Sequence, residues 1–211
     1  MLFEVQVEHS FGETHIACNF ASAGRVTALV GPSGQGKTSV LNAIAGLLRP
    51  DAGRIAVSGE VLFDSANGIT IPPEKRRAAY VFQDARLFPH MNVSANLSYG
   101  AKLAKGRDGL IAIADLIDLL GIGDLLSRYP ATLSGGETRR VAIGRALLSA
   151  PRFMLLDEPM ASLDEERAER MRSLIEQLRD ELDLPILLVS HDAIEVERLA
   201  DQIVRMGQSG N

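Results

Sequence analysis

The most informative part of this 211-residue chain is Gly31-Pro32-Ser33-Gly34-Gln35-Gly36-Lys37-Thr38. Residues 26–30 before it are uniformly apolar, as in a strand covered on both faces, and residues 38–48 after it have the pattern of a helix. Glycines let the backbone of such a loop curl until successive N–H groups point inward, and the helix that it opens adds partial positive charge. This context predicts a loop that binds the phosphates of a nucleoside triphosphate, here called the phosphate loop.

The polar residues of the phosphate loop have distinct predicted roles. Lys37 supplies a point charge to the β- and γ-phosphates and counts among the catalytic residues, while the hydroxyl of Thr38 is offered to Mg²⁺. A nucleoside triphosphate and Mg²⁺ are therefore the predicted cofactors. The residues predicted to bind the nucleotide here are Gly31, Pro32, Ser33, Gly34, Gln35, Gly36, Lys37, Thr38 and Ser39.

Two carboxylates follow a second apolar strand, predicted at residues 153–156. Asp157 would be out of place at the end of a buried strand unless it holds a cation, so it is a predicted magnesium ligand together with Thr38. Alternation points Glu158 differently, toward an attacking water, and a general base there is worth ~10²–10⁴-fold in rate. Alone, the pair could merely cap the next segment, but beside the phosphate loop the catalytic interpretation is preferred.

Two further polar residues stand just after predicted strands. Gln83 follows residues 80–82, where an amide can ligate Mg²⁺ or hold the attacking water without adding negative charge. His191 follows residues 186–189, where it is expected to donate a hydrogen bond to the γ-phosphate and to hold Glu158 in place. A lone residue of either type at a strand end is ordinarily structural. His191 is nevertheless a predicted catalytic residue, and Gln83 becomes one only through the resemblance to a known family that is given below.

The stretch Leu133-Ser134-Gly135-Gly136-Glu137, here called the signature turn, is a second glycine-rich turn. It precedes a helix predicted from about residue 137 to residue 149. A hydroxyl, two glycines and a helix N-terminus together predict a second anion site at Ser134, Gly135 and Gly136. Between the two loops, strands disappear at about residues 85–135 and apolar residues recur at helical spacing, which predicts an inserted helical lobe.

The order of these motifs resembles that of the nucleotide-binding subunit of an ATP-binding-cassette (ABC) protein, over nearly all of the chain. Strands that alternate with helices from residue 136 onward independently predict an α/β fold with a parallel sheet. The resemblance specifies that fold class: a P-loop NTPase (RecA-like) core with a parallel sheet, an N-terminal antiparallel β subdomain and an inserted helical subdomain. It also specifies ATP as the nucleotide.

The resemblance implies that two copies of the chain share each nucleotide. In ABC ATPases the signature turn covers the ATP held by the other subunit, so a head-to-tail homodimer with twofold symmetry is expected. Ala161-Ser162-Leu163-Asp164 matches the loop that crosses this dimer, which places Asp164 among the expected nucleotide contacts. Phe11 stands where the family has an aromatic residue that stacks on adenine, and core packing of Phe11 is the alternative.

One segment resembles bacterial importers in particular. Residues 82–93 and 96–100 match the part of importer ATPases that receives a helix of the membrane subunit, so membrane subunits are expected to dock between Gln83 and Tyr99. Packing of Leu87, Phe88 and Met91 inside the lobe is the alternative. Residues 84–90, 141–148 and 160–164 resemble molybdate importers.

The implied function is ATP hydrolysis that powers import of molybdate or a related oxyanion, with a substrate-binding protein as an indirect partner. The alternatives are another substrate (sulfate, thiamine, a polyamine or a sugar) or a non-transport ABC ATPase that switches another complex.

Composition sets the expected location and partners. The net charge of −5 argues against nucleic acid as a partner. No apolar run approaches the ~20 residues of a membrane span, and the start lacks the basic region of a signal peptide. A peripheral protein at the cytoplasmic face of the membrane is therefore expected. The lone cysteine, Cys18, is expected to be a small buried residue.

Two departures from the family pattern are visible. Thr138, Arg139 and Arg140 replace the more usual Lys or Gln after the signature turn, and we expect no effect on catalysis. The chain also ends directly after the last predicted strand, where molybdate, sulfate and maltose-type ATPases usually continue into a β-rich regulatory domain. One nucleotide-binding domain over residues 1–211, with no C-terminal regulatory domain, is the predicted organisation.

Overall fold

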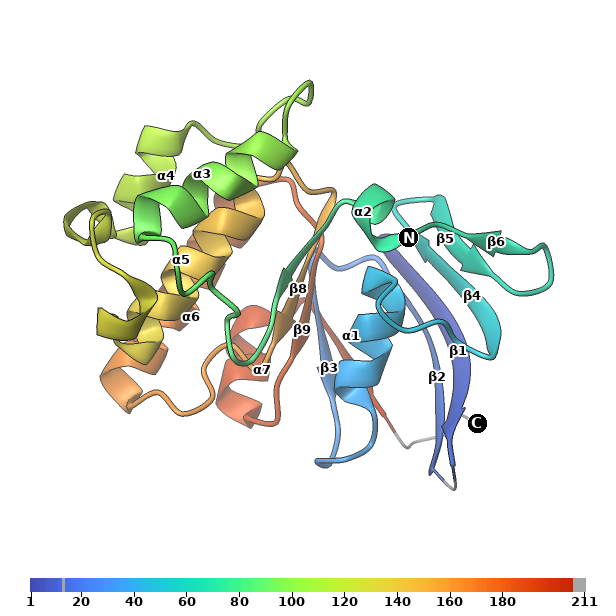
Figure 1. Ribbon diagram of the computed structural model, residues 1–211. Coiled ribbons are helices and arrows are strands. Elements are labelled where there is room, and N and C mark those ends of the chain that lie inside the picture. Colours follow the sequence, from blue (N-terminus) through green and yellow to red (C-terminus); the bar gives the residue numbers. More distant parts are fainter. Residues whose placement is uncertain (13, 207–211) are drawn as a thin grey trace.

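The computed structural model describes residues 1–12 and 14–206 and contains an antiparallel and a parallel sheet (Figure 1). The antiparallel sheet has the strand order β2-β1-β4-β5-β6, and the parallel sheet has the order β10-β3-β9-β8-β7. The strands are β1 (Phe3–Phe11), β2 (Thr14–Ser22), β3 (Val26–Val30), β4 (Ala52–Val57), β5 (Glu60–Asp64), β6 (Ile69–Thr70), β7 (Ala78–Val81), β8 (Phe153–Asp157), β9 (Ile186–Val189) and β10 (Gln202–Arg205).

Helices cover the parallel sheet on both faces, with α1 and the antiparallel sheet on one face and α3 to α6 on the other (Figure 1). Between β7 and α5 lie α3, α4 and two 3-10 turns, Gly123–Leu125 and Pro130–Thr132. The helices are α1 (Lys37–Ala45), α2 (Pro73–Arg76), α3 (Val93–Leu103), α4 (Ile113–Leu120), α5 (Gly135–Leu147), α6 (Glu165–Glu181) and α7 (Ala193–Leu199).

The parallel sheet separates two hydrophobic cores, because successive side chains of a strand point to opposite faces. On β8, Met154 and Leu156 pack with the helical lobe, α5 and α6. Phe153 and Leu155 point the other way and pack with α1 and the antiparallel sheet. The two helices that begin at glycine-rich turns, α1 and α5, therefore lie on opposite faces of one sheet.

The predicted fold class is confirmed, and two strands, β3 and β9, have the predicted bounds. Helix α5 begins at Gly135 rather than near Glu137, because Ser134 caps it. The short helix α2 begins with Pro73 at its first position, where the missing N–H costs nothing. Cys18 is buried, as predicted.

The end of the chain is described only through Met206, just after β10. Residues 207–211, on which the prediction of no further domain depends, lie outside the described residues. Among the described helices, none has both the length and the apolar character that a bilayer crossing requires.

Candidate functional site

The phosphate loop connects β3 to α1 and depends on glycine at its last turn. Gly34 and Gly36 have φ angles of 83° and 87°, in the left-handed region where glycine is favoured. A Cβ atom on Gly36 would also come within 2.6 Å of Cδ1 of Ile16 on β2. The antiparallel sheet thus packs directly against the loop, and the first N–H groups of α1 are left without intrahelical partners.

Lys37 concentrates positive charge at this end of α1. Its side chain is 6% exposed, and Nζ donates hydrogen bonds to the carbonyl oxygens of Gly31, at 2.7 Å, and Pro32, at 2.9 Å. The buried Oε1 atom of Gln35 has no hydrogen-bond partner among the described residues. The loop therefore combines a fixed cation with free backbone donors, which is the chemistry that suits a phosphate group.

Thr38, Gln83 and Asp157, the three predicted magnesium ligands, line one pocket. Oγ1 of Thr38 donates a hydrogen bond to Oδ1 of Asp157 at 3.2 Å. Burial raises the pKa of Asp157, and the bond from Thr38 partly opposes that rise. A dication would offset the cost of burying this carboxylate, and a hydroxyl, an amide and a carboxylate are the oxygen ligands that Mg²⁺ prefers.

Glu158 and His191, the other two predicted catalytic residues, contact each other. Nδ1 of His191 lies 3.3 Å from Oε1 of Glu158, whose side chain is only 20% exposed. Glu158 has a φ angle of 46°, a left-handed conformation that is uncommon and strained for a residue other than glycine. Gln83 lines a second pocket together with Glu158 and His191, so it lies between these two residues and the predicted magnesium ligands Thr38 and Asp157.

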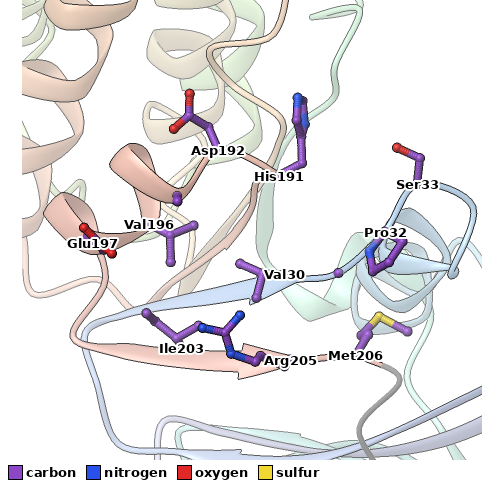
Figure 2. A pocket seen from close by; sticks show the side chains of 12 residues that line it. Val30, Pro32, Ser33, His191, Asp192, Val196, Glu197, Ile203, Arg205 and Met206 are labelled. Atoms are coloured by element: carbon purple, nitrogen blue, oxygen red, sulfur yellow. The ribbon is translucent and has the colours of Figure 1, made fainter.

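His191 also faces the phosphate loop. A third pocket lies between residues 30–33, the start of α7 and strand β10 (Figure 2). Pro32 and Ser33 line one side of it, and His191 and Asp192 line the other. Asp192 caps α7 by accepting a hydrogen bond from the N–H of Ile194 at 2.8 Å, which fixes the backbone next to His191.

The signature turn is closed on itself by a capping box. The N–H of Ser134 donates to Oε2 of Glu137 at 2.7 Å, and the N–H of Glu137 donates to Oγ of Ser134 at 3.4 Å. The bond from Ser134 is the main cause of a lowered pKa at Glu137. The pattern Ser134-x-x-Glu137 is a signal of such a capping box in the sequence itself.

Within one chain, the signature turn does not join the phosphate loop. The neighbours of Gly135 and Gly136 are Leu163 and Arg167, at the start of α6. Because α5 and α1 lie on opposite faces of the parallel sheet, Ser134–Gly136 forms a separate candidate site.

Two predicted nucleotide contacts have other neighbours here. Asp164 caps α6 by accepting a hydrogen bond from the N–H of Arg167 at 2.9 Å, so its contact with a nucleotide stays a prediction. Phe11, at the end of β1, is 48% exposed, and its ring meets that of His9 edge-on, at 4.3 Å between centroids. This exposure contradicts the core-packing alternative for Phe11, and its stacking on adenine stays a prediction.

Arg139, which the sequence marks only as a departure from the family pattern, lies next to the site. Arg139 on α5 is 7% exposed, and its Nη2 atom donates a hydrogen bond to the carbonyl oxygen of Gln83 at 3.3 Å. The signal was available in the helical spacing, because Gly136 and Ile143 place Arg139 on the buried face of α5.

Comparisons with known proteins agree on the type of protein. A family model described as ABC transporter matches residues 19–161. The chain is 53% identical over 208 residues to the molybdenum import ATP-binding protein ModC of Mesorhizobium japonicum, which covers 99% of this chain and 56% of that protein. It is 56% identical over 200 residues to the protein of the same name from Brucella melitensis, with coverages of 95% and 55%. The chain thus spans slightly more than half the length of these relatives.

Solved structures of the same kind share the fold. A dimeric bacterial ABC transporter cassette superposes with a TM-score of 0.77 and 26% sequence identity, over 97% of this chain and 94% of that chain. A component of the cbiONQ ABC transporter complex from Clostridium perfringens superposes with the same TM-score and identity, over 97% and 84%.

Proposed function

The chain belongs to the ABC transporter family, and from this premise we propose that it is the ATP-hydrolysing subunit of a bacterial importer of molybdate or a related oxyanion. The observation that carries the catalytic part is the position of Gln83, which lines one pocket with Thr38 and Asp157 and another with Glu158 and His191. The 49–56% identity to molybdenum import ATP-binding proteins supports the choice of substrate.

The phosphate loop is the proposed site for the ATP phosphates. The loop amides and Lys37 neutralise phosphate charge, and Phe11 offers an exposed ring for stacking on adenine. Thr38, Gln83 and Asp157 hold Mg²⁺, which neutralises charge on the phosphates during hydrolysis. The buried pair of Asp157 and Thr38 supports this proposal, because a buried carboxylate calls for a cation.

Glu158 and His191 are proposed to act on the attacking water. Glu158 accepts or orients its proton, and His191 holds the Glu158 carboxylate by the contact at 3.3 Å. The hydrogen bonds at Asp192 fix the start of α7, so the imidazole is positioned from a rigid helix end rather than from a free loop.

We propose that the second half of each site comes from another copy of the chain. Ser134, Gly135 and Gly136 present a helix N-terminus on the face opposite α1, where they can reach a partner's nucleotide but not their own. Asp164 lies in the loop that crosses this dimer. ATP closes the homodimer, closure moves the membrane subunits, and hydrolysis reopens it.

The segment from Gln83 to Tyr99 is the proposed docking site for the membrane subunits. Tyr99 is 40% exposed and meets Phe88 edge-on at 4.7 Å, while Arg86 stacks on the ring of Phe82 at 3.9 Å. Leu87 packs partly against the lobe core, so the lobe supports this aromatic surface from behind. A substrate-binding protein takes part indirectly, through the membrane subunits.

The proposed organisation is one nucleotide-binding domain over residues 1–211, with the helical subdomain inserted at about residues 85–135, at the cytoplasmic face of the membrane. Reconstitution with the membrane subunits from the same source tests the proposal. The proposal is supported if the reconstituted complex takes up labelled molybdate in an ATP-dependent manner. Unlabelled tungstate should compete with this uptake, and sulfate should not. Hydrolysis coupled to uptake of sulfate, thiamine, a polyamine or a sugar contradicts the substrate, and failure to bind any membrane subunit contradicts the importer.

A further inference from the structure

A buried arginine of the helical side of the molecule reaches the segment that carries Gln83. Arg139 lies on α5, the helix that begins at the signature turn, and it is 7% exposed. Nη2 of Arg139 donates a hydrogen bond to the backbone carbonyl of Gln83 at 3.3 Å. Burial of a guanidinium group is costly unless hydrogen bonds and opposite charges offset it, so this placement calls for a role.

The carbonyl that Arg139 contacts lies beyond the sheet. The last residue of β7 paired with β8 is Val81, so the ladder does not hold the carbonyl of residue 83. A buried or half-buried carbonyl without a donor is unfavourable, and Arg139 supplies that donor. The backbone position of Gln83 is thus set from α5 and not from the strand that precedes it.

A second arginine of α5 holds the next turn of the same segment. Nη2 of Arg145 donates to the carbonyl of Ala85 at 3.3 Å. Ala85 and Arg86 have φ angles of 57° and 46°, so this turn is strained and needs external support. Two carbonyls of residues 83–86 are therefore hydrogen-bonded to α5, by arginines that lie six residues apart on that helix.

Arg139 also stands among the carboxylates behind the site. Burial lowers the pKa of the Arg139 guanidinium, and the negative charges of Glu195 and Glu158 oppose that shift. Both carboxylates line the same pocket as Gln83. Oγ of Ser190 donates a hydrogen bond to Glu195, which keeps that carboxylate within the pocket wall.

We propose that Arg139 is a positioning residue, which acts through its hydrogen bond to the Gln83 carbonyl. This bond holds the Gln83 side chain between the proposed magnesium ligands, Thr38 and Asp157, and the pair of Glu158 and His191. This inference rests on the proposed ATP hydrolysis and replaces the expectation that Arg139 has no effect on catalysis. Because Arg139 and the signature turn belong to one helix, it also ties the position of Gln83 to that of α5.

A double-variant cycle tests the proposal. Arg139→Gln should lower kcat by about 10- to 100-fold, the range for residues that hold a ligand from behind. The KM for MgATP should change by less than about 2-fold, because no ground-state contact with the nucleotide is lost. Arg139→Lys should restore part of kcat, since it retains one charged donor. In a Gln83→Ala background, Arg139→Gln should change kcat by less than about 2-fold, because the side chain that Arg139 positions is absent.

The matched control is Arg170→Gln, which removes a guanidinium from the exposed face of α6, where it pairs with Glu166. It should leave kcat unchanged. A wild-type kcat in Arg139→Gln, or a full further loss in the Gln83→Ala background, overturns the positioning role. Absence of ATP hydrolysis by the wild-type dimer would instead remove the proposed function.

Hydrogen exchange of the nucleotide-free protein gives a readout that does not depend on activity. The N–H groups of Ala85 and Arg86 are bonded to the carbonyls of Phe82 and Asp84 at 2.9 Å and 2.7 Å. Arg139→Gln should accelerate exchange at these two amides, while β7 and α5 keep wild-type protection. Unchanged exchange at residues 85 and 86, or equal acceleration throughout the chain, overturns the local role.

Discussion

The phosphate loop and the signature turn use the same local device in different ways. Both are glycine-rich, and both open a helix whose first N–H groups face outward. The phosphate loop adds a buried cation at Lys37 and a hydroxyl bonded to Asp157, so it offers a nearly complete site for phosphate and metal. The signature turn adds only Ser134, whose hydroxyl accepts the N–H of Glu137 in a capping box. The two turns therefore differ in what stands beside their free N–H groups, which is a buried cation in one and a closed capping box in the other.

The difference in position explains the difference in composition. Helix α1 packs with the antiparallel sheet, and α5 packs with the helical lobe on the opposite face of the parallel sheet. Within one chain, the two turns therefore begin helices on different sides of the parallel sheet. A rigid turn with free N–H groups and no cation suits a surface that closes over a phosphate already held by another copy.

The largest expected effect tests the phosphate-loop side. Glu158→Gln keeps the shape of the site but removes the charge that activates water, so hydrolysis should fall by ~10²-fold or more. ATP binding should remain near normal, and the ATP-dependent dimer should persist. Phosphate release, nucleotide binding and size-exclusion chromatography measure the three quantities. Hydrolysis at the wild-type rate would exclude Glu158 from the role assigned to it.

A smaller effect concerns the adenine end of the same site. Phe11→Ala should weaken ATP affinity by ~1–3 kcal/mol, the value of one stacking contact. The midpoint of thermal unfolding without nucleotide should hardly change, because Phe11 is 48% exposed. Calorimetric titration measures the affinity, and Phe11→Tyr, which keeps the ring, should bind as the wild type does. Large destabilisation with unchanged affinity would contradict the assignment.

The smallest effect concerns the closure of the signature turn. The lowered pKa of Glu137 means that its charge stabilises the folded state at pH values above the unfolded pKa of about 4.3. That contribution is lost as the pH falls through the lower, folded pKa. At pH 7, Glu137→Gln should therefore be less stable than the wild type by about 0.3–1 kcal/mol.

Urea unfolding at several pH values measures this difference. The gap between wild type and Glu137→Gln should close as the pH falls below about 4. A gap that stays constant at low pH would show that the carboxylate charge is not what closes the turn.

The sequence alone predicts those features that follow from the residues of one segment or from the order of the strands and helices. The run before the phosphate loop has the predicted bounds of β3, and the structure brings Thr38, Gln83 and Asp157 to one pocket although they are distant in the chain. Parallel strands put their carboxyl ends at one edge of the sheet, so residues that follow three different strands meet there. Such convergence can be predicted from element order alone.

The features that the sequence did not predict depend on contacts between elements, and local sequence patterns do not specify such contacts. The role of Ile16 in packing against Gly36 follows from how the antiparallel sheet sits on the loop. The approach of Arg139 to the Gln83 carbonyl depends on how α5 packs on β7, and exposure of Phe11 depends on the end of a hairpin. The start of α5 was missed for a different reason, since the capping pattern was visible but was assigned to anion binding alone.

The central claim is that each active site takes its phosphate loop from one chain and its signature turn from another. Lys37→Ala removes the phosphate-loop cation. Gly135→Glu puts a carboxylate at the exposed first position of α5, where it suits the helix dipole but repels a phosphate. Neither variant alone should hydrolyse ATP, because both sites of each homodimer are damaged.

Mixing the two inactive variants is the most direct measurement. In a mixed dimer, one site collects both defects, and the other receives an intact phosphate loop from the Gly135→Glu chain and an intact signature turn from the Lys37→Ala chain. We predict that ATP hydrolysis reappears on mixing, rises with the fraction of mixed dimers and is lost on dilution to monomers. A mixture that stays as inactive as its components, with mixed dimers shown to form, would contradict the shared site.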